Sequence, residues 1–328
     1  MPARLLFLHT GGTLGMVPVG KDGALTPDHF SRSVEPYIRG VESIAEIESR
    51  LVCNIDSSDM SPDRWIEIGT IIAESIRDYD GFVVLHGTDT MSFTACALSF
   101  MLRDLPRPVI LTGSQRPLAE LRTDARINLV HSTLCATMDI PEVGLYFGSR
   151  LFRGNRTTKI SLQSYHAFAS PNFPPILEMG VDVARHAEVL RPRGAFRFRT
   201  GFSRDVGVLS LFPGVSSSQL SWMVDQGARV VVLRAFGDGN LPRAAWPEAV
   251  RKATDQGIHV IIMSQCRSGT ISPGRYEGSR KALDCGALFS EDMTGEAVVV
   301  KSMWLLGQGI VGEGFRSSFN HPLAGECR

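Results

Sequence analysis

The chain of 328 residues is 43% hydrophobic and 21% charged, a composition that fits a globular protein large enough for two domains. Its 34 Lys and Arg residues balance its 34 Asp and Glu residues, so nothing in its charge favours a nucleic acid or an anionic membrane as a partner. No apolar run approaches the roughly 20 residues of a membrane-spanning helix, and the first residues lack the long apolar segment and cleavage site of a signal peptide.

Short apolar segments alternate with longer amphipathic segments along most of the chain. The apolar segments predict buried strands at Arg4–His9, Gly81–Leu85, Pro108–Leu111, Val143–Phe147, Val206–Leu211, Val230–Leu233 and His259–Met263. The amphipathic segments predict helices at Ser61–Asp78, Ser92–Leu102, Asp124–Thr137, Ser216–Gln226, Ala244–Gln256, Gly278–Gly286 and within Thr294–Leu306. Ser61 followed by Pro62 is a typical helix start, with Ser as the N-cap. Short buried strands separated by helices favour parallel βαβ units.

The alternation stops between about Pro171 and Asp205, where prolines and a basic, irregular stretch take its place. We therefore predict an α/β protein of two domains. The larger N-terminal domain, residues 1–185, carries a parallel or mixed, flavodoxin-like sheet. A linker covers residues 186–205, and a smaller, Rossmann-like α/β domain covers residues 206–328.

Two phrases place threonine beside glycine directly after a predicted strand. Thr10-Gly11-Gly12-Thr13 follows the first strand, and His86-Gly87-Thr88-Asp89-Thr90-Met91 follows the second. In an open α/β sheet, ligands bind in the crevice beyond the carboxyl ends of the strands. We therefore expect the hydroxyls of Thr13 and Thr88 to face one pocket, where a threonine can attack a carbonyl group.

A threonine hydroxyl needs a base or a cation nearby to become a nucleophile. Lys159 closes the phrase Arg153–Lys159 beyond another predicted strand, and a buried lysine can act as a base. Thr88, Lys159 and Asp89 then form a set of nucleophile, base and orienting group. The alternative is that Lys159 is an ordinary solvated surface residue.

Other small residues near the predicted strand ends can bind a substrate. A short extended segment is predicted at Leu51–Ile55. The segment Asp56-Ser57-Ser58 follows it and offers backbone N–H groups that suit a carboxylate, although these residues can equally begin the next helix. Ser114 follows another strand and can supply a wall of the pocket. The N–H groups of Gly12 and Gly87 are candidates for an oxyanion hole. The residues in question are Gly12, Asp56, Ser57, Ser58, Gly87 and Ser114.

The six cysteines are scattered, without a C-x-x-C pair or a neighbouring pair of histidines. This pattern favours free thiols over disulfides or a metal site. We expect a cytoplasmic protein that holds no metal. His86 is interpreted as a structural residue at a strand end.

Seven further segments, together with the two threonine phrases, resemble the bacterial-type L-asparaginases, and most closely their cytoplasmic type I branch. They are DSSDM at 56–60, LTGSQRP at 111–117, RGNRTTK at 153–159, FASPN at 168–172, FGDGN at 236–240, SQCRSG at 264–269 and DMT at 292–294. One TGG is a weak signal, whereas all of these segments in this order are very specific, and they cover essentially the whole chain.

The resemblance implies a reaction and a role for each matching residue. Thr13 corresponds to the nucleophile that attacks a side-chain amide, and Thr88, Asp89 and Lys159 to a second catalytic set. Ser57, Ser58 and Asp89 correspond to holders of the substrate's carboxylate and ammonium, with Ser114 and the Gly12 backbone completing the pocket. The implied reaction converts L-asparagine and water to L-aspartate and ammonia through an acyl-enzyme, without a cofactor. The implied assembly is a homotetramer of tight dimers, with each site between the N-domain of one subunit and the C-domain of its partner.

The sequence departs from the family pattern in the segment after TGGT. The family usually carries there a tyrosine that activates the first threonine, but Asp22–Pro27 has Ala24 at the matching position. We hypothesise that Tyr276 supplies the phenol, across a dimer interface, and that Asn240 or water contacts the substrate amine. Type I relatives can also carry an effector pocket, for which Thr158, Arg234 and Cys266 are candidates; Arg234 can instead be an interface residue.

Several alternatives remain open at this point. The enzyme can prefer glutamine, D-asparagine or another small amide, because the departures fall where substrate choice is set. A subunit of a tRNA-dependent amidotransferase is disfavoured by the lack of an added N-terminal domain and of a basic balance. A non-catalytic asparagine sensor is conceivable because of Ala24, although the catalytic set is intact. A nucleotide-binding G-x-G-x-x-G fails at Pro242.

Overall fold

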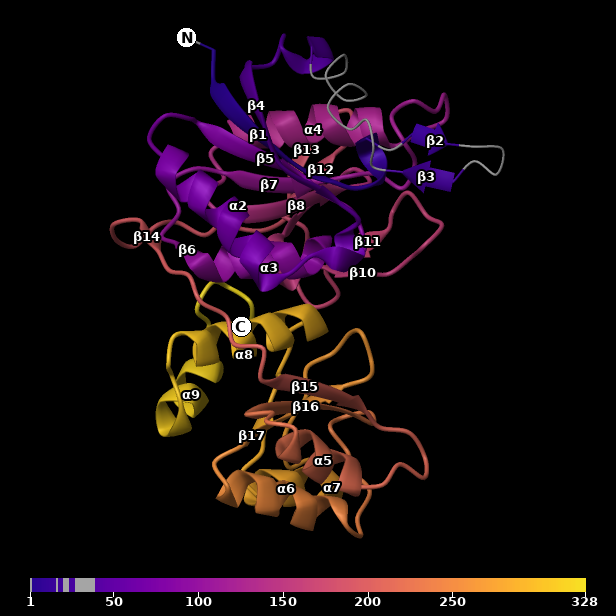
Figure 1. Ribbon diagram of the computed structural model, residues 1–328, viewed down its shortest axis with the longest axis vertical. Helices are drawn as coiled ribbons and strands as arrows, with labels where there is room; N and C mark the ends of the chain where they lie inside the picture. The colour runs from indigo at the N-terminus through magenta and orange to yellow at the C-terminus, as the bar shows by residue number, and fades with distance from the viewer. Residues whose placement is uncertain (1, 16, 20–23, 27–38) are drawn as a thin grey trace. The chain divides into compact units, whose positions relative to one another are not determined.

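The computed structural model describes residues 2–15, 17–19, 24–26 and 39–328 (Figure 1). They divide into two compact units, residues 1–199 and 200–328. The division falls inside the segment 186–205, and the short strand β14 (Arg197–Phe198) still pairs with β6 (Leu102–Arg103) of the first unit.

The first unit is built on an eight-stranded sheet in the order β13-β12-β9-β8-β7-β5-β1-β4. Its strands are β1 (Arg4–Gly11), β4 (Glu46–Ile55), β5 (Gly81–Leu85), β7 (Val109–Thr112), β8 (Val143–Phe147), β9 (Arg150–Arg153), β12 (Leu177–Met179) and β13 (Val183–Arg185). Two small antiparallel pairs accompany it, β2 (Val17–Val19) with β3 (Ala24–Thr26) and β10 (Thr158–Lys159) with β11 (Phe168–Ala169). The helices are α2 (Pro62–Ser75), α3 (Met91–Met101) and α4 (Ala125–Thr137), and the short 3₁₀ turns are η1 (Thr13–Gly15), η2 (Arg39–Val41), η3 (Ser57–Asp59) and η4 (Gly154–Arg156).

Five neighbouring strands of this sheet run parallel, in the order β4-β1-β5-β7-β8. Counted along the chain, this is the order 2-1-3-4-5 of the flavodoxin-like fold. β9, β12 and β13 extend the sheet with antiparallel pairs. The predicted mixed, flavodoxin-like sheet is therefore confirmed.

The central strands are continuous apolar runs because helices cover both faces of the sheet. Figure 1 shows α4 on one face and α2 and α3 on the other. Alternate residues of β1 and β5, such as Leu5 and Val83, pack with Leu129 of α4 in one fully buried cluster. Rigid strands packed in this way fix the positions of the loops at their ends.

The second unit has four parallel strands in the order β15-β16-β17-β18, which confirms the smaller Rossmann-like α/β domain. The strands are β15 (Val206–Ser210), β16 (Val230–Ala235), β17 (His259–Ser264) and β18 (Leu288–Phe289). The helices are α5 (Ser218–Asp225), α6 (Trp246–Asp255), α7 (Glu277–Asp284), α8 (Gly295–Gly307) and α9 (Gly312–Phe319). Its core packs Leu233 and Ile262 of the strands against Val250 of α6.

All predicted strands and helices are present, and the differences lie in weak elements. β4 begins five residues before the predicted extended segment Leu51–Ile55; it is an edge strand, and most of its side chains are exposed. β12 and β13 lie in the segment where the alternation stops. Ser61 is the N-cap residue of α2, as predicted, but its side chain makes no capping hydrogen bond.

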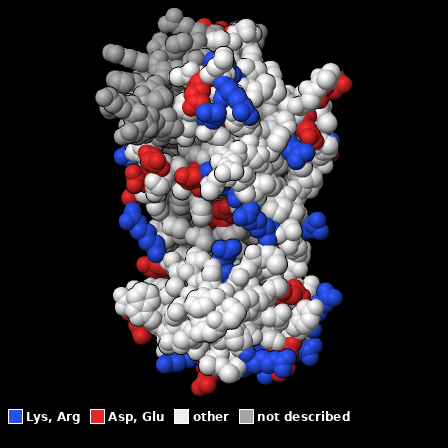
Figure 2. Space-filling view, turned by 90° about the vertical axis from the view of Figure 1, so that its right-hand side faces the viewer, with Lys and Arg blue, Asp and Glu red and all other residues white. Residues whose placement is uncertain are grey.

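Within the described ranges, no helix combines the length and the apolar character that a bilayer span requires. Lysine and arginine are interspersed with aspartate and glutamate on the face that Figure 2 shows, in line with a formal net charge of zero.

Candidate active site

The strand order reverses between β1 and β5, and ligands bind at such a switch point in open α/β sheets. The TGGT phrase lies at the end of β1 and the HGTDT phrase directly after β5. A hydrogen bond of 2.9 Å from the Thr10 hydroxyl to the Leu85 carbonyl joins the two strand ends. The two phrases therefore meet at one edge of the sheet, as predicted.

Three backbone segments approach one another more closely than side chains allow. Gly12 has φ +89°, and a Cβ on it would lie 2.5 Å from Cα and N of Gly87. A Cβ on Gly87 would lie 2.6 Å from Cβ and Oγ of Ser57. The hydroxyl of Thr90 also donates to the Ser57 carbonyl at 2.7 Å. Only glycine fits at 12 and 87, and these glycines bring Thr13, Thr88 and Ser57 to one place.

Lys159 reaches both Thr88 and Asp89 from β10. Its Nζ donates to Oγ1 of Thr88 at 2.7 Å and to Oδ1 of Asp89 at 2.6 Å. The Lys159 side chain is 16% exposed, whereas the Asp89 side chain is 63% exposed. Lys159 is therefore not a solvated surface lysine: its ammonium is largely shielded, while the carboxylate beside it stays accessible to a solute.

Thr13 begins the 3₁₀ turn η1 directly after Gly12 and is partly buried. The next residue, Leu14, accepts a backbone hydrogen bond of 3.0 Å from Leu118. This bond connects the TGGT loop to the loop that follows β7, which carries Ser114.

Gln115 contacts Thr88 of the predicted catalytic set, a role that the sequence did not assign to it. The Thr88 hydroxyl donates to its Oε1 at 3.4 Å, and its Nε2 donates to the carbonyls of Leu162 at 3.0 Å and Ser164 at 3.3 Å. The signal that could have found it is its place in LTGSQRP, beyond β7, which lies next to β5 in the sheet. Gln115 therefore joins Thr88 to the loop between β10 and β11.

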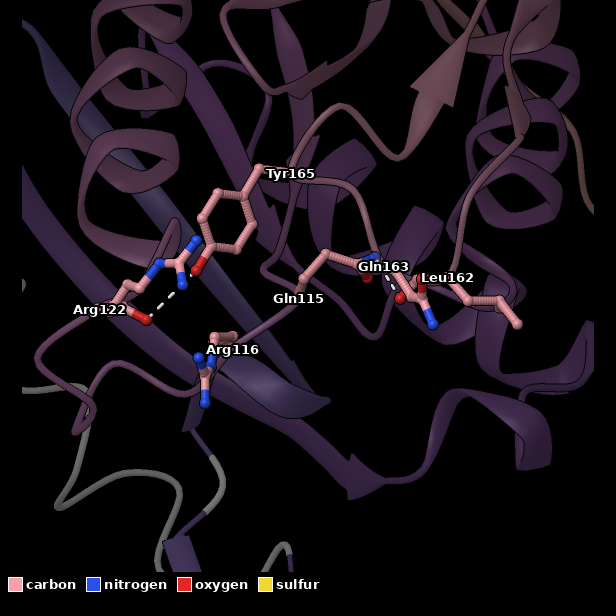
Figure 3. Close-up of a pocket in the computed structure, with 6 residues that line it drawn as sticks. All are labelled: Gln115, Arg116, Arg122, Leu162, Gln163 and Tyr165. Atoms are coloured by element: carbon pink, nitrogen blue, oxygen red, sulfur yellow. Dashed lines mark hydrogen bonds between the residues drawn. The ribbon is translucent and has the colours of Figure 1, made fainter.

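The same glutamine lines a pocket of about 390 Å³. Figure 3 shows its lining residues, which come from the loop after β7 and from the loop between β10 and β11: Gln115, Arg116, Arg122, Leu162, Gln163 and Tyr165. The Tyr165 hydroxyl donates to the Arg122 carbonyl at 3.3 Å across this pocket. The candidate residues chosen from the sequence are not among these lining residues, but Thr88 contacts one of them, Gln115.

The loop that carries Gln115 is held by a buried carboxylate. Asp124 accepts the backbone N–H groups of Gln115 and Arg116 and the side-chain amide of Asn128, at 3.0 to 3.2 Å. Burial raises the pKa of Asp124, although these hydrogen bonds act in the opposite direction. Ser114 donates its hydroxyl to the Arg116 carbonyl at 2.6 Å, within the same loop.

The serine segment is ordered around Asp56 at the start of η3. One Asp56 carboxylate oxygen accepts from the backbone N–H of Ser58 at 2.8 Å and from its hydroxyl at 2.9 Å. Ser57 is buried against Gly87, while Asp56 and Ser58 are exposed. The segment forms the 3₁₀ turn η3 just before α2, and its binding of a carboxylate stays a prediction.

Four candidate residues lie in the second unit. Tyr276 is exposed and is the N-cap residue of α7, and Asn240 closes a turn by hydrogen bonds with Phe236. Arg234 lies on β16, and Cys266 is an exposed free thiol. All four belong to residues 200–328, whereas Thr158 lies next to Lys159 on β10. Their roles remain predictions.

The segment with the missing tyrosine is only partly described. Ala24 begins β3, while Asp22, Gly23 and Pro27 lie outside the described residues. Among the described residues, no group of three or more His, Cys, Asp or Glu side chains is arranged to hold a metal ion.

Two family domains match the chain. "Asparaginase, N-terminal" covers residues 4–191, and "Glutaminase/Asparaginase C-terminal domain" covers residues 205–319. L-asparaginase 1 of Escherichia coli is 39% identical over 324 residues, 97% of this chain and 96% of that protein.

Solved structures give the same result. L-asparaginase I from Vibrio cholerae has a TM-score of 0.90 with 34% identity, covering 100% of both chains. The thermostable L-asparaginase from Thermococcus kodakarensis has a TM-score of 0.91 with 32% identity, covering 99% of both chains. Fold, site and relatives together define a hydrolase that acts on amides. The chain belongs to the asparaginase family, as the resemblance of its motifs implied.

Proposed function

We propose that the protein hydrolyses L-asparagine to L-aspartate and ammonia through an ester on Thr13. The observation that carries this proposal is the Thr88 hydroxyl, held 2.7 Å from the shielded ammonium of Lys159 directly beside the TGGT turn. Family membership and the L-asparaginase relatives support the same substrate.

The reaction proceeds in two balanced steps. The Thr13 oxygen forms a bond to the side-chain carbonyl carbon of asparagine, the C–N bond breaks, and the hydroxyl proton leaves on ammonia. Water then attacks the ester, the bond to Thr13 breaks, one water proton regenerates the hydroxyl, and the other passes to ammonia as the aspartate carboxylate is released. Lys159 lies between Thr88 and Asp89, and as a neutral amine it takes the proton of Thr88 Oγ1 while Asp89 orients it.

The substrate is held by groups at the two strand ends. The exposed Asp89 carboxylate binds the α-ammonium, and Ser57 and Ser58 hold the α-carboxylate. Backbone N–H groups at Gly12 and Gly87 stabilise the oxyanion that develops on the amide carbonyl. Ser114 and Asp56 keep the surrounding loops in place, because both accept or donate hydrogen bonds within them.

The direct test is ammonia release from L-asparagine, L-glutamine and D-asparagine. The wild type is compared with Thr13→Ala and Thr88→Val, and with Thr133→Val as a control, since Thr133 is a buried α4 threonine whose hydroxyl donates to Leu129 of its own helix. Rapid release from L-asparagine that only the first two substitutions abolish supports the proposal. No release by the wild type, with asparagine still bound, supports a sensor instead.

L-glutamine is a second candidate substrate, favoured by the match of residues 205–319 to a glutaminase/asparaginase domain. One methylene changes discrimination in a pocket by only about 1–3 kcal/mol. The ratio of kcat/KM for the two amides decides between them.

Tyr276 is proposed as the phenol that activates Thr13, contributed across a dimer interface as the family assembly implies. We propose a cytoplasmic homo-oligomer, a dimer or a dimer of dimers, with Asn240 or water at the substrate amine. Tyr276→Phe should lower kcat by about 10²–10⁴-fold, while Tyr79→Phe, remote on the first unit, should not. Unchanged turnover in Tyr276→Phe would exclude this role.

Thr158, Arg234 and Cys266 are proposed to form an effector site for asparagine. Sigmoidal dependence of the rate on asparagine that becomes hyperbolic in Arg234→Ala is the expected result. Hyperbolic kinetics that Arg234→Ala leaves unchanged would contradict the effector site, without affecting the proposed chemistry.

A further inference from the structure

A chain of buried hydrogen bonds leads from α2 through α3 to the backbone beside Thr88. The indole N–H of Trp65, on α2, donates to the hydroxyl of Thr94, on α3, at 3.0 Å. The Thr94 hydroxyl oxygen lies 2.8 Å from Nε2 of His86, and Nδ1 of His86 lies 2.7 Å from the Gly87 carbonyl oxygen. Thr94 and His86 are 0% and 1% exposed, so water does not compete for these bonds.

Chemistry fixes the direction of every bond in this chain. A carbonyl only accepts, so Nδ1 of His86 carries the proton. Burial lowers the pKa of His86 to about 4, so the ring is neutral near pH 7 and Nε2 is an acceptor. Thr94 therefore donates its single hydroxyl proton to His86 and accepts from Trp65, whose indole is only a donor. With the protons placed in this way, each hydrogen bond of the chain joins one donor to one acceptor.

The last bond acts on the peptide that carries the N–H of Thr88. Because a peptide unit is planar, holding the Gly87 oxygen sets the orientation of the whole Gly87–Thr88 peptide. Thr88 then extends from this peptide to Lys159, 2.7 Å from its hydroxyl. Glycine at 87 has little intrinsic conformational restriction, so the restriction has to come from a neighbour.

We infer that His86, oriented by Thr94 and Trp65, is a positioning residue that holds the Gly87–Thr88 peptide so that the Thr88 hydroxyl meets Lys159. Its importance for catalysis rests on the proposed function, but its effect on the Thr88 geometry does not. A fully satisfied buried network of this kind rigidifies its surroundings, and a displacement of about 1 Å at a reacting group can cost about 10²-fold in rate.

Two substitutions of His86 separate its two nitrogens. The side-chain amide of Asn reaches the position of Nδ1, and that of Gln reaches the position of Nε2. His86→Asn keeps a donor to the Gly87 carbonyl and should retain most of kcat. His86→Gln loses this donor and should lower kcat by about 10–100-fold with little change of KM.

Thr94→Val tests the middle of the chain without changing the size of the side chain. It should also lower kcat, because the ring of His86 loses the hydroxyl that fixes its orientation, and Trp65→Phe should do so less. Thr133→Val is the matched control: Thr133 is equally buried, but its hydroxyl donates to Leu129 of its own helix. Rates are compared for the folded fraction of each variant.

A second readout needs no enzymatic activity. In protein with ¹³C-labelled threonine methyl groups, the Thr88 methyl resonance should shift in Thr94→Val and His86→Gln and stay in place in Thr133→Val. The ¹⁵N resonances of His86 should report the Nδ1–H tautomer in the wild type.

The outcomes separate this inference from the proposed function. Wild-type kcat in both His86→Gln and Thr94→Val, or equal losses in Thr94→Val and Thr133→Val, would overturn the inference while the proposed reaction stands. If the wild type hydrolyses no amide, the proposed function fails, and the Thr88 methyl resonance decides the inference: a shift in Thr94→Val supports it, and an unchanged resonance refutes it.

Discussion

The ammonium nitrogen of Lys159 lies 2.7 Å from the hydroxyl oxygen of Thr88, although 71 positions separate the two residues along the chain. The short antiparallel pair of β10 with β11 carries the lysine, and the turn after β5 carries the threonine. Two motifs that lie far apart in the sequence thus produce a contact that can move a proton.

Replacement of Lys159 by methionine tests this contact, because methionine has a similar length and no charge. We expect kcat for amide hydrolysis to fall by about 10²–10⁴-fold, the usual contribution of a general acid–base group. Ammonia release by Lys159→Met is compared with that of Lys252→Met, an exposed position on α6. Near-normal turnover in Lys159→Met would remove the lysine from the mechanism.

Gly12→Ala should inactivate the enzyme through a backbone clash. The new Cβ would lie 2.5 Å from Gly87, in addition to the strain of φ +89°. Gly227→Ala provides the control, since its φ of +95° carries similar strain while nothing lies within 4 Å of the Cβ position. Unfolding by denaturant should show a loss of about 1–2 kcal/mol in the control and a clearly larger loss in Gly12→Ala; equal losses would argue against the close approach of the two glycines.

A buried ion pair should stabilise the second unit. Nζ of Lys301 lies 2.6 Å from Oε1 of Glu326, both side chains are 0% exposed, and Nζ also donates to the carbonyls of Phe319 and His321. Either Lys301→Met or Glu326→Leu should cost about 3–5 kcal/mol of unfolding free energy, because one buried group loses its partner. In a double-mutant cycle, Lys301→Met with Glu326→Leu should cost less than the two single changes combined. Strict additivity would show that the pair is not coupled.

Stability should depend on pH through His86. The pKa of this ring is lowered by burial from 6.5 to about 4, so below pH 6.5 the unfolded chain binds a proton that the folded chain excludes. The resulting contribution to the free energy of unfolding is fully present above pH 6.5 and is lost as the pH falls towards 4. It amounts to about 3 kcal/mol at most. The stability advantage of the wild type over His86→Asn should shrink over this range in urea unfolding; parallel curves would show that the ring titrates normally.

Strands buried on both faces were predictable because their sequences are uninterrupted apolar runs, as in Gly81–Leu85. Of the edge strand β4, the sequence predicted only the last residues, Leu51–Ile55, because Glu46–Arg50 is mostly exposed and polar. β12 and β13 are three residues long and lie among prolines, where no periodicity can develop.

The site was predictable where residues with reactive side chains directly follow predicted strands. Threonines next to glycines after buried strands indicated where Thr13 and Thr88 would meet. The contact between Gln115 and Thr88, and the bonds that join Trp65 and Thr94 to His86, depend on how loops and helices pack across the sheet. Such contacts between distant residues have no local pattern that a single sequence can display.

The close approach of Gly12, Gly87 and Ser57 limits how this enzyme can be altered. At 12 and 87 even one added methyl group collides with a neighbouring segment, so a library that varies these positions would yield inactive clones. New substrate preferences would have to come from side chains on the remaining walls, such as the loop of Gln115. The backbone around Thr13 and Thr88 is in effect invariant, and adaptation is confined to the side chains that surround the rest of the substrate.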